Sequence, residues 1–359
     1  MFSAVTSLKT YLGFSSQTRP RKRARVSEDE RPVTAVSLVK LTQDREFWLD
    51  DGNIVLIARD VGFRIYRGLL AAQSTVFADM FGSSNSTADE YYEDCPVVRL
   101  SDSPEDLRYL LRVLVPRSYR MFYRDNDKQP LSFDEISAVI RLSHKYHVAD
   151  AQRQALSALK LYFSDDFSDL RGFEGHGLFL IKRSDAIAAV NIARLTETTS
   201  ILPIAFYRCC ELGTAVMDGC LRADGYIEHL SVEDHKICMI GRLALLREAR
   251  ALVFRIFQET STPRCLSRRI CRSALHTMLV RAAVEEAPLE PAVFRDWTPF
   301  TDKQADRLGL CRRCRRMLLG RELAVRREIW GRLPEIFGLY IFGWGVDDSG
   351  STSEPSSNW

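Results

Sequence analysis

The chain has 359 residues, which is enough for two domains and tails. Its apolar content of 46% is typical of globular protein, and a formal net charge of +3 gives no strong field for nucleic acid or an anionic membrane. No apolar run is long enough to span a bilayer, no secretory signal is evident, and nine cysteines therefore suggest free thiols in a reducing compartment.

Residues 1–44 are expected to form a disordered tail. Within the tail lies a basic run that contains Arg21, Lys22, Arg23 and Arg25. Such a run indicates a nuclear import signal, or only a solvated basic segment. Because residues 1–26 have no acidic side chain, a mitochondrial transit peptide is a third interpretation. We expect a nuclear or cytoplasmic location, and the basic run favours the nucleus.

Two short strands and two short helices are predicted next. Asp51 and Gly52 form a turn pair before a strand at 53–58, which is apolar on both faces and therefore predicted to be covered on both sides. A second strand at 63–66 alternates with a period of two, and Ser74 is predicted to cap the following helix. The apolar stripe of that helix consists of Val76, Phe77, Met80 and Phe81.

The pattern continues with a strand at 97–100 and further helices. Ser103 and Ser132 are predicted helix N-caps, since each is followed by acidic residues in the first turn. A helix at 149–163 completes this part of the chain. His147 falls in line with an apolar helical stripe, and we predict a buried core histidine there instead of a metal ligand.

Residues 46–165 resemble the BTB/POZ domain of protein-interaction adaptors. Tyr66 stands where many members carry histidine, although several fungal members also carry tyrosine. The resemblance implies a small sheet flanked by helices, placed here at residues 45–165. The residues that match the family pattern are Asp51, Gly52, Phe63, Leu70, Ser74, Phe77, Met80 and Phe81.

Residues 166–345 are predicted to form an all-α domain, followed by an acidic, serine-rich tail at 346–359. The end of the all-α domain resembles that of fungal BTB proteins, in which a Cys-x2-Cys pair precedes a long helix and a Trp-x2-Leu-Pro segment follows it. The fold class is thus α+β, a BTB/POZ fold followed by helices. The predicted helices cover 185–195, 201–212, 231–257, 265–284 and 311–332, with an irregular link at 286–300.

The resemblance implies a protein-interaction adaptor that pairs with another BTB domain. No catalytic motif is present, so we expect no enzyme, no cofactor and no catalytic residue. The alternatives are a nuclear transcription regulator, or a cullin adaptor that uses the hydrophobic-x-Glu pattern of Tyr91 and Glu93. In BTB dimers the contact surfaces lie near the first strand and helix, here Phe47, Trp48, Leu49, Leu69 and Leu70.

Two further features have both a chemical and a structural interpretation. Cys311 and Cys314 have zinc-ligand spacing, and Cys265 and Cys271 could supply the other pair, but buried free thiols are the favoured interpretation. We therefore assign no metal ligand from the sequence alone. The arginine-rich helix at 311–332 also carries an apolar stripe, so a packed helix with a solvated basic face is expected instead of nucleic-acid binding.

Overall fold

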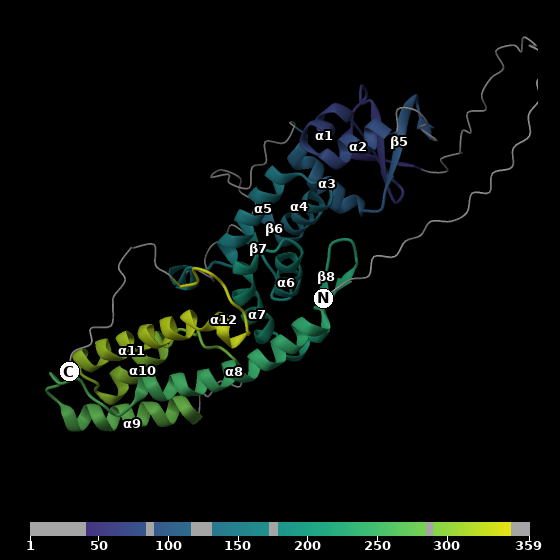
Figure 1. Cartoon of the computed structure of the whole chain (residues 1–359). Coiled ribbons are helices and arrows are strands. Elements are labelled where there is room, and N and C mark those ends of the chain that lie inside the picture. Colours follow the sequence, from purple (N-terminus) through teal and green to yellow (C-terminus); the bar gives the residue numbers. More distant parts are fainter. Residues whose placement is uncertain (1–40, 84–89, 116–130, 172–178, 285–289, 346–359) are drawn as a thin grey trace, which may run out of the picture.

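The computed structural model of the chain describes residues 41–83, 90–115, 131–171, 179–284 and 290–345. The main sheet forms near the start and helices follow, so the fold class is α+β, as the sequence predicts. Figure 1 shows an elongated arrangement with the sheet at one end and the longest helices at the other. In the described part of the chain, no helix combines the length and apolarity of a membrane span.

A five-stranded mixed sheet has the order β1-β3-β2-β5-β4. Strands β2 and β3 form an antiparallel hairpin, whereas β1 runs parallel to β3 and β5 runs parallel to β2. All five residues of β2 are buried, which confirms the prediction of a strand covered on both sides. The strands are β1 (Thr42–Trp48), β2 (Ile54–Ala58), β3 (Val61–Ile65), β4 (Tyr91–Tyr92) and β5 (Cys95–Leu100).

Five helices accompany this sheet, and serine caps begin three of them. Ser74 Oγ accepts the Phe77 N–H at 3.0 Å, and Ser103 and Ser132 accept the N–H groups three residues after them. These bonds confirm the predicted N-caps, each of which satisfies a backbone donor that has no partner inside its helix. The helices are α1 (Arg67–Gln73), α2 (Thr75–Ser83), α3 (Pro104–Leu114), α4 (Phe133–Lys145) and α5 (Ala149–Tyr162).

The remainder of the chain is mainly helical, with α8 as its longest element. Ser231 caps α8 by accepting the Asp234 N–H at 3.0 Å, at the place where the sequence predicts the helix to start. The helices are α6 (Asp185–Leu195), α7 (Leu202–Glu211), α8 (Val232–Phe257), α9 (Arg268–Val284), α10 (Thr298–Leu308), α11 (Arg312–Gly331) and α12 (Leu333–Ile336). The short strands are β6 (Leu131–Ser132), β7 (Phe179–Leu180), β8 (Cys220–Leu221) and β9 (Ile227–Glu228), and the 3₁₀ turns are η1 (Phe167–Arg171), η2 (Thr199–Ile201) and η3 (Gly213–Met217).

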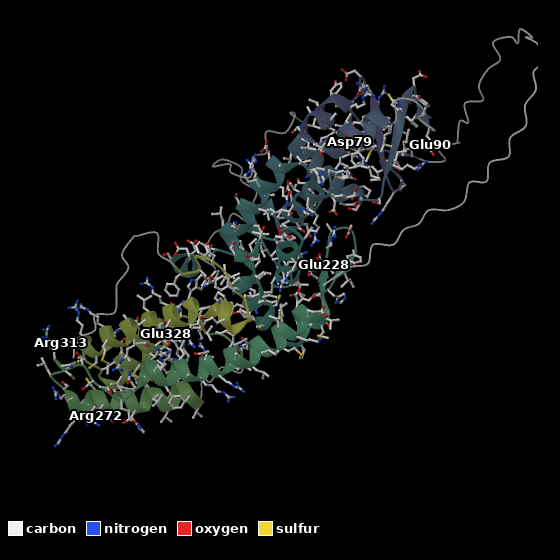
Figure 2. The ribbon with its side chains drawn as sticks, in the orientation of Figure 1. Asp79, Glu90, Glu228, Arg272, Arg313 and Glu328 are labelled. Atoms are coloured by element: carbon white, nitrogen blue, oxygen red, sulfur yellow. The ribbon has the colours of Figure 1, made fainter. Side chains whose placement is uncertain are left out.

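A polar clamp joins the sheet-bearing part of the chain to the later helices. The Glu228 carboxylate of β9 accepts two hydrogen bonds from Arg141 of α4, at 2.7 and 2.8 Å, and one from Asn191 of α6 at 2.7 Å. In the turn that joins β8 to β9, Arg222 pairs with Asp106 of α3. One apolar core also runs continuously from the sheet to the last helices. Figure 2 shows Glu228 at the middle of the molecule, between these two parts.

Two local predictions are wrong. His147 is exposed and adopts a left-handed conformation with φ of 53°, because α4 ends at Lys145 and Tyr146 and Val148 turn inward in its place. The segment predicted as an irregular link up to residue 300 ends in a helix, α10, which has Pro299 in its first turn. Proline suits that position because its missing N–H would have no partner there.

Glu322 of α11 is a buried carboxylate that holds the loop before α10. It accepts the Trp297 N–H at 2.9 Å and a hydrogen bond from Arg326 at 3.3 Å. Burial raises the pKa of Glu322 above its ordinary 4.5, even though both of these bonds act to lower it. The native state therefore keeps this proton to a higher pH than the unfolded chain does.

We predict that wild type loses stability relative to Glu322→Gln as the pH rises from 4.5 through the raised pKa. The sign follows because, in that window, the unfolded chain has already released the proton that the native state still binds. Urea unfolding of both proteins at several pH values measures the difference in the free energy of unfolding. If the difference in the free energy of unfolding stayed constant, or moved in favour of wild type with rising pH, the raised pKa of Glu322 would be contradicted.

Candidate functional site

The residues expected to form an interaction surface divide into buried and accessible groups. Phe47, Leu49 and Leu70 are 2%, 5% and 0% exposed, and they fill the interior. Trp48 and Leu69 remain half-buried and keep some accessible surface. Of these five residues, therefore, only Trp48 and Leu69 keep surface that a partner could touch.

On one face of the sheet, the apolar side chains that pack together come from the strands and from Leu41, the residue before β1. Val55 and Ile57 point to this side, away from the main core, and form a small second apolar cluster with Cys95. Trp48 and Tyr92 meet above it edge to face, with ring centroids 5.6 Å apart. We call this surface the open face and define it by the half-buried residues Leu41, Trp48, Tyr92 and Val97.

Helices cover the opposite face of the sheet. Ile54 and Leu56 alternate with the residues beneath the open face and belong to the main core, which includes residues of α2 and α3. Because successive side chains of a strand point to opposite faces, the β2 sequence itself produces these two sides. Figure 1 shows α1, α2 and α3 gathered beside the sheet.

The outer strand β1 is poorly suited to accept an additional strand. Its register is interrupted between Gln43 and Trp48, and Asp44 accepts the N–H groups of residues 46 and 47 at 2.9 Å. Asp44 and Glu46 also form ion pairs with Arg108 and Arg112 of α3, both at 2.7 Å. Irregular pairing and charged side chains are features that protect sheet edges. Contact through the open face is therefore favoured over pairing at this edge.

The residues of the cullin-type pattern lie at the other edge of the sheet. Tyr91 is 52% exposed and does not join the cluster under Tyr92, because neighbouring strand residues point to opposite faces. Glu93 occupies the β4–β5 turn with φ of 45° and pairs with Arg64 at 3.3 Å. The import candidates lie outside the described residues; they are Arg21, Lys22, Arg23 and Arg25.

The two cysteine pairs come together at the far end of the molecule. Cys265 lies in the loop after α8, Cys271 in the first turn of α9, Cys311 at the N-cap of α11 and Cys314 in its first turn. Their four Sγ atoms all lie within 4.8 Å of one another. Spacing within each pair was visible in the sequence, whereas the forty residues between the pairs hid their convergence.

Hydrogen bonds set the thiol chemistry of this group. Burial raises the pKa of Cys311, but the Cys314 N–H and the neighbouring thiols donate to its sulfur and lower that pKa to about 7. Burial is also the main reason that the pKa of Cys314 rises to about 12. The arrangement thus favours the thiolate of Cys311, at the N-cap of α11, over that of Cys314.

A cavity of about 290 Å³ lies between α5, α6 and α7. Arg208 and Glu211 form an ion pair at its wall, at 2.7 Å. Among the described residues that line it, the charged side chains are Lys182, Arg183, Arg208, Glu211 and Glu290. The other lining residues are Tyr162, Phe163, Ile181 and Ala186.

Comparison with known proteins finds no match: no family model, no curated protein and no solved structure is significantly similar to this chain.

Proposed function

We propose that the chain is a non-enzymatic interaction adaptor, whose sheet-bearing part is a BTB/POZ-like unit that binds another unit of the same kind. The observation that carries this proposal is the open face. Its tryptophan and tyrosine are residue types enriched among the side chains that dominate binding energy at protein interfaces. A partner laid on this face would bury apolar surface that the described residues leave partly in water.

The order of elements also supports a BTB/POZ-like unit. A strand hairpin is followed by the helix pair α1 and α2, then by β5 beside β2, and finally by α3, α4 and α5. A small sheet wrapped by helix pairs is what the sequence resemblance implies. The later helices, joined to this unit by the Glu228 clamp, would then hold a second part of the molecule at a fixed orientation to the bound partner.

Replacing Tyr92 by alanine is expected to weaken self-association at least about 30-fold, since truncating a central interface aromatic costs about 2 kcal/mol or more. Tyr92 supports the Trp48 ring and sits over the cluster of Val55 and Ile57. Fluorescence anisotropy of a labelled copy titrated with unlabelled protein measures the dissociation constant. Urea unfolding of the variant establishes that it is folded at the concentrations used.

The matched control is Tyr91→Ala, which removes the same ring type one position earlier, on the opposite side of β4. We expect its dissociation constant to change less than about threefold, the effect of a peripheral residue. Equal dissociation constants for wild type and Tyr92→Ala would contradict the open-face proposal. A loss confined to Tyr91→Ala would instead indicate the edge that carries the cullin-type pattern.

A further inference from the structure

We propose that Cys265, Cys271, Cys311 and Cys314 bind one structural zinc ion. Across the described residues they are the only group of three or more histidine, cysteine or acidic ligand atoms close enough to share a metal. Three of the four are buried, and only Cys311 is partly exposed. Four thiolates complete a tetrahedral shell and leave no open position, which is the pattern of structural zinc sites in proteins.

The spacing of the sulfur atoms fits this ion. Zn–S bonds of about 2.3 Å in a tetrahedron place the sulfur atoms about 3.8 Å apart. Cys265 Sγ and Cys311 Sγ lie 3.8 Å apart, and no distance within the group exceeds 4.8 Å. A disulfide needs about 2.05 Å between sulfur atoms, so none of these thiols is paired in the structure.

Backbone N–H groups already point at the sulfur atoms. The Cys311 N–H donates to Cys271 Sγ at 3.4 Å, the Cys314 N–H donates to Cys311 Sγ, and the Thr262 N–H donates to Cys314 Sγ. Each of these three sulfur atoms thus has one backbone donor, and such a donor stabilises a thiolate, which can only accept hydrogen bonds. These bonds supply the outer layer of contacts that orients metal ligands.

The surroundings offset the charge of such a centre. One Zn²⁺ with four thiolates carries a net charge of −2, and the N-termini of α9 and α11, both near the sulfur atoms, present partial positive charge. Figure 2 shows Arg272 and Arg313 at this end of the molecule. The exposed arginines within three residues of the four cysteines are Arg264, Arg268, Arg269, Arg272, Arg312, Arg313 and Arg316.

The ion would add a fixed point to a loop whose carbonyl oxygens already accept hydrogen bonds from Arg321 and Arg313 of α11. Residues 258–267 form no regular secondary structure, and Leu266 within them is 87% exposed. Two of the four ligands come from this loop and the start of α9, and the other two from the start of α11. A metal here links these segments while α9 and α11 each pack along α8. We therefore assign the centre a structural role.

Metal analysis of the full-length chain, purified without an affinity metal or a chelator, tests the proposal. We expect about one zinc per chain, the stoichiometry of a single tetrahedral site. Replacement by cobalt should give the visible absorption of a tetrahedral thiolate complex. Cys271→Ser and Cys314→Ser should each lower zinc below about 0.1 per chain, since the closed shell then lacks a ligand. Cys95→Ser, which changes a buried cysteine of β5, should keep the full content.

Wild-type measurements decide the outcome if the cysteine variants fail to fold. A strong zinc chelator should lower the melting temperature of wild type, and added zinc should restore it. Three results would overturn the proposal: a chain that lacks zinc after growth in zinc-supplemented medium, a chain that holds iron in place of zinc, or an intact mass two hydrogens low that shows a disulfide among these cysteines.

Discussion

Glu228→Ala is expected to lower the free energy of unfolding by about 3 kcal/mol, because it leaves the Arg141 guanidinium without its carboxylate in a mostly buried position. The Glu228 side chain is 8% exposed and that of Arg141 is 18% exposed. Asn191 loses the same acceptor. Because the clamp joins α4 and α6 to the β8–β9 hairpin, the variant should also loosen the sheet-bearing part from the later helices. Urea unfolding followed by tryptophan fluorescence measures the loss.

An exposed pair of the same chemistry provides the control. Glu328 pairs with Arg255 on the surface, where the two side chains are 48% and 40% exposed. Since solvent screens such pairs, Glu328→Ala should cost less than about 1 kcal/mol. Figure 2 labels both glutamates and shows them in different parts of the molecule. If the two alanine variants lost equal stability, the clamp would not hold these parts together in the way described.

Gly241→Ala is expected to destabilise the protein by about 1–3 kcal/mol, the usual cost of overpacking a well-filled core. A Cβ at this position of α8 would overlap the ring atoms Cδ1 and Cε1 of Phe337. That ring cannot easily move, because Phe337 is 3% exposed and lies against Phe206, with ring centroids 5.4 Å apart. Thermal and urea unfolding of the purified variant measure the effect.

The same substitution should have the opposite sign at Gly320. This glycine lies inside α11, is exposed, and has no atom within 4 Å of the position that a Cβ would take. Alanine there should stabilise the helix by about 1 kcal/mol, because glycine is the poorer helix former. The two variants should therefore differ by about 2–4 kcal/mol. A Gly241→Ala protein as stable as Gly320→Ala would show that α8 and α12 do not pack this closely.

Features fixed by a few neighbouring residues were predictable from the sequence. The caps at Ser74, Ser103 and Ser132 depend on one hydroxyl and an N–H three residues later. The buried strand β2 follows from a run of β-branched residues between turn signals. Both kinds of signal are local, and the structure has them where the sequence placed them.

Features that depend on distant residues were missed. Helix α10 has a polar sequence with proline near its start, and its buried side chains, such as Phe300, gain their environment only from packing. His147 follows the helical period in the sequence, but α4 ends two residues before it. The open face could not be predicted from the sequence, because it depends on a contact between the rings of Tyr92 in β4 and Trp48 in β1.

The cysteine group is intermediate between these cases. The spacing of Cys311 and Cys314 suggested zinc and Cys265 and Cys271 were a candidate second pair, but the sequence could not show whether the pairs meet. Cys271 and Cys311 are forty residues apart, and they come together because α9 and α11 both pack on α8 with their starts at the same end. The N–H groups of Cys311, Cys314 and Thr262 that point at the sulfur atoms were likewise invisible without the fold.

Multi-angle light scattering of the full-length chain over a range of concentrations tests the proposed adaptor role most directly. If the open face binds another unit of the same kind, the average mass should rise from that of one chain toward twice that value as the concentration increases. A mass that stayed at one chain up to high micromolar concentrations would contradict self-association through this face.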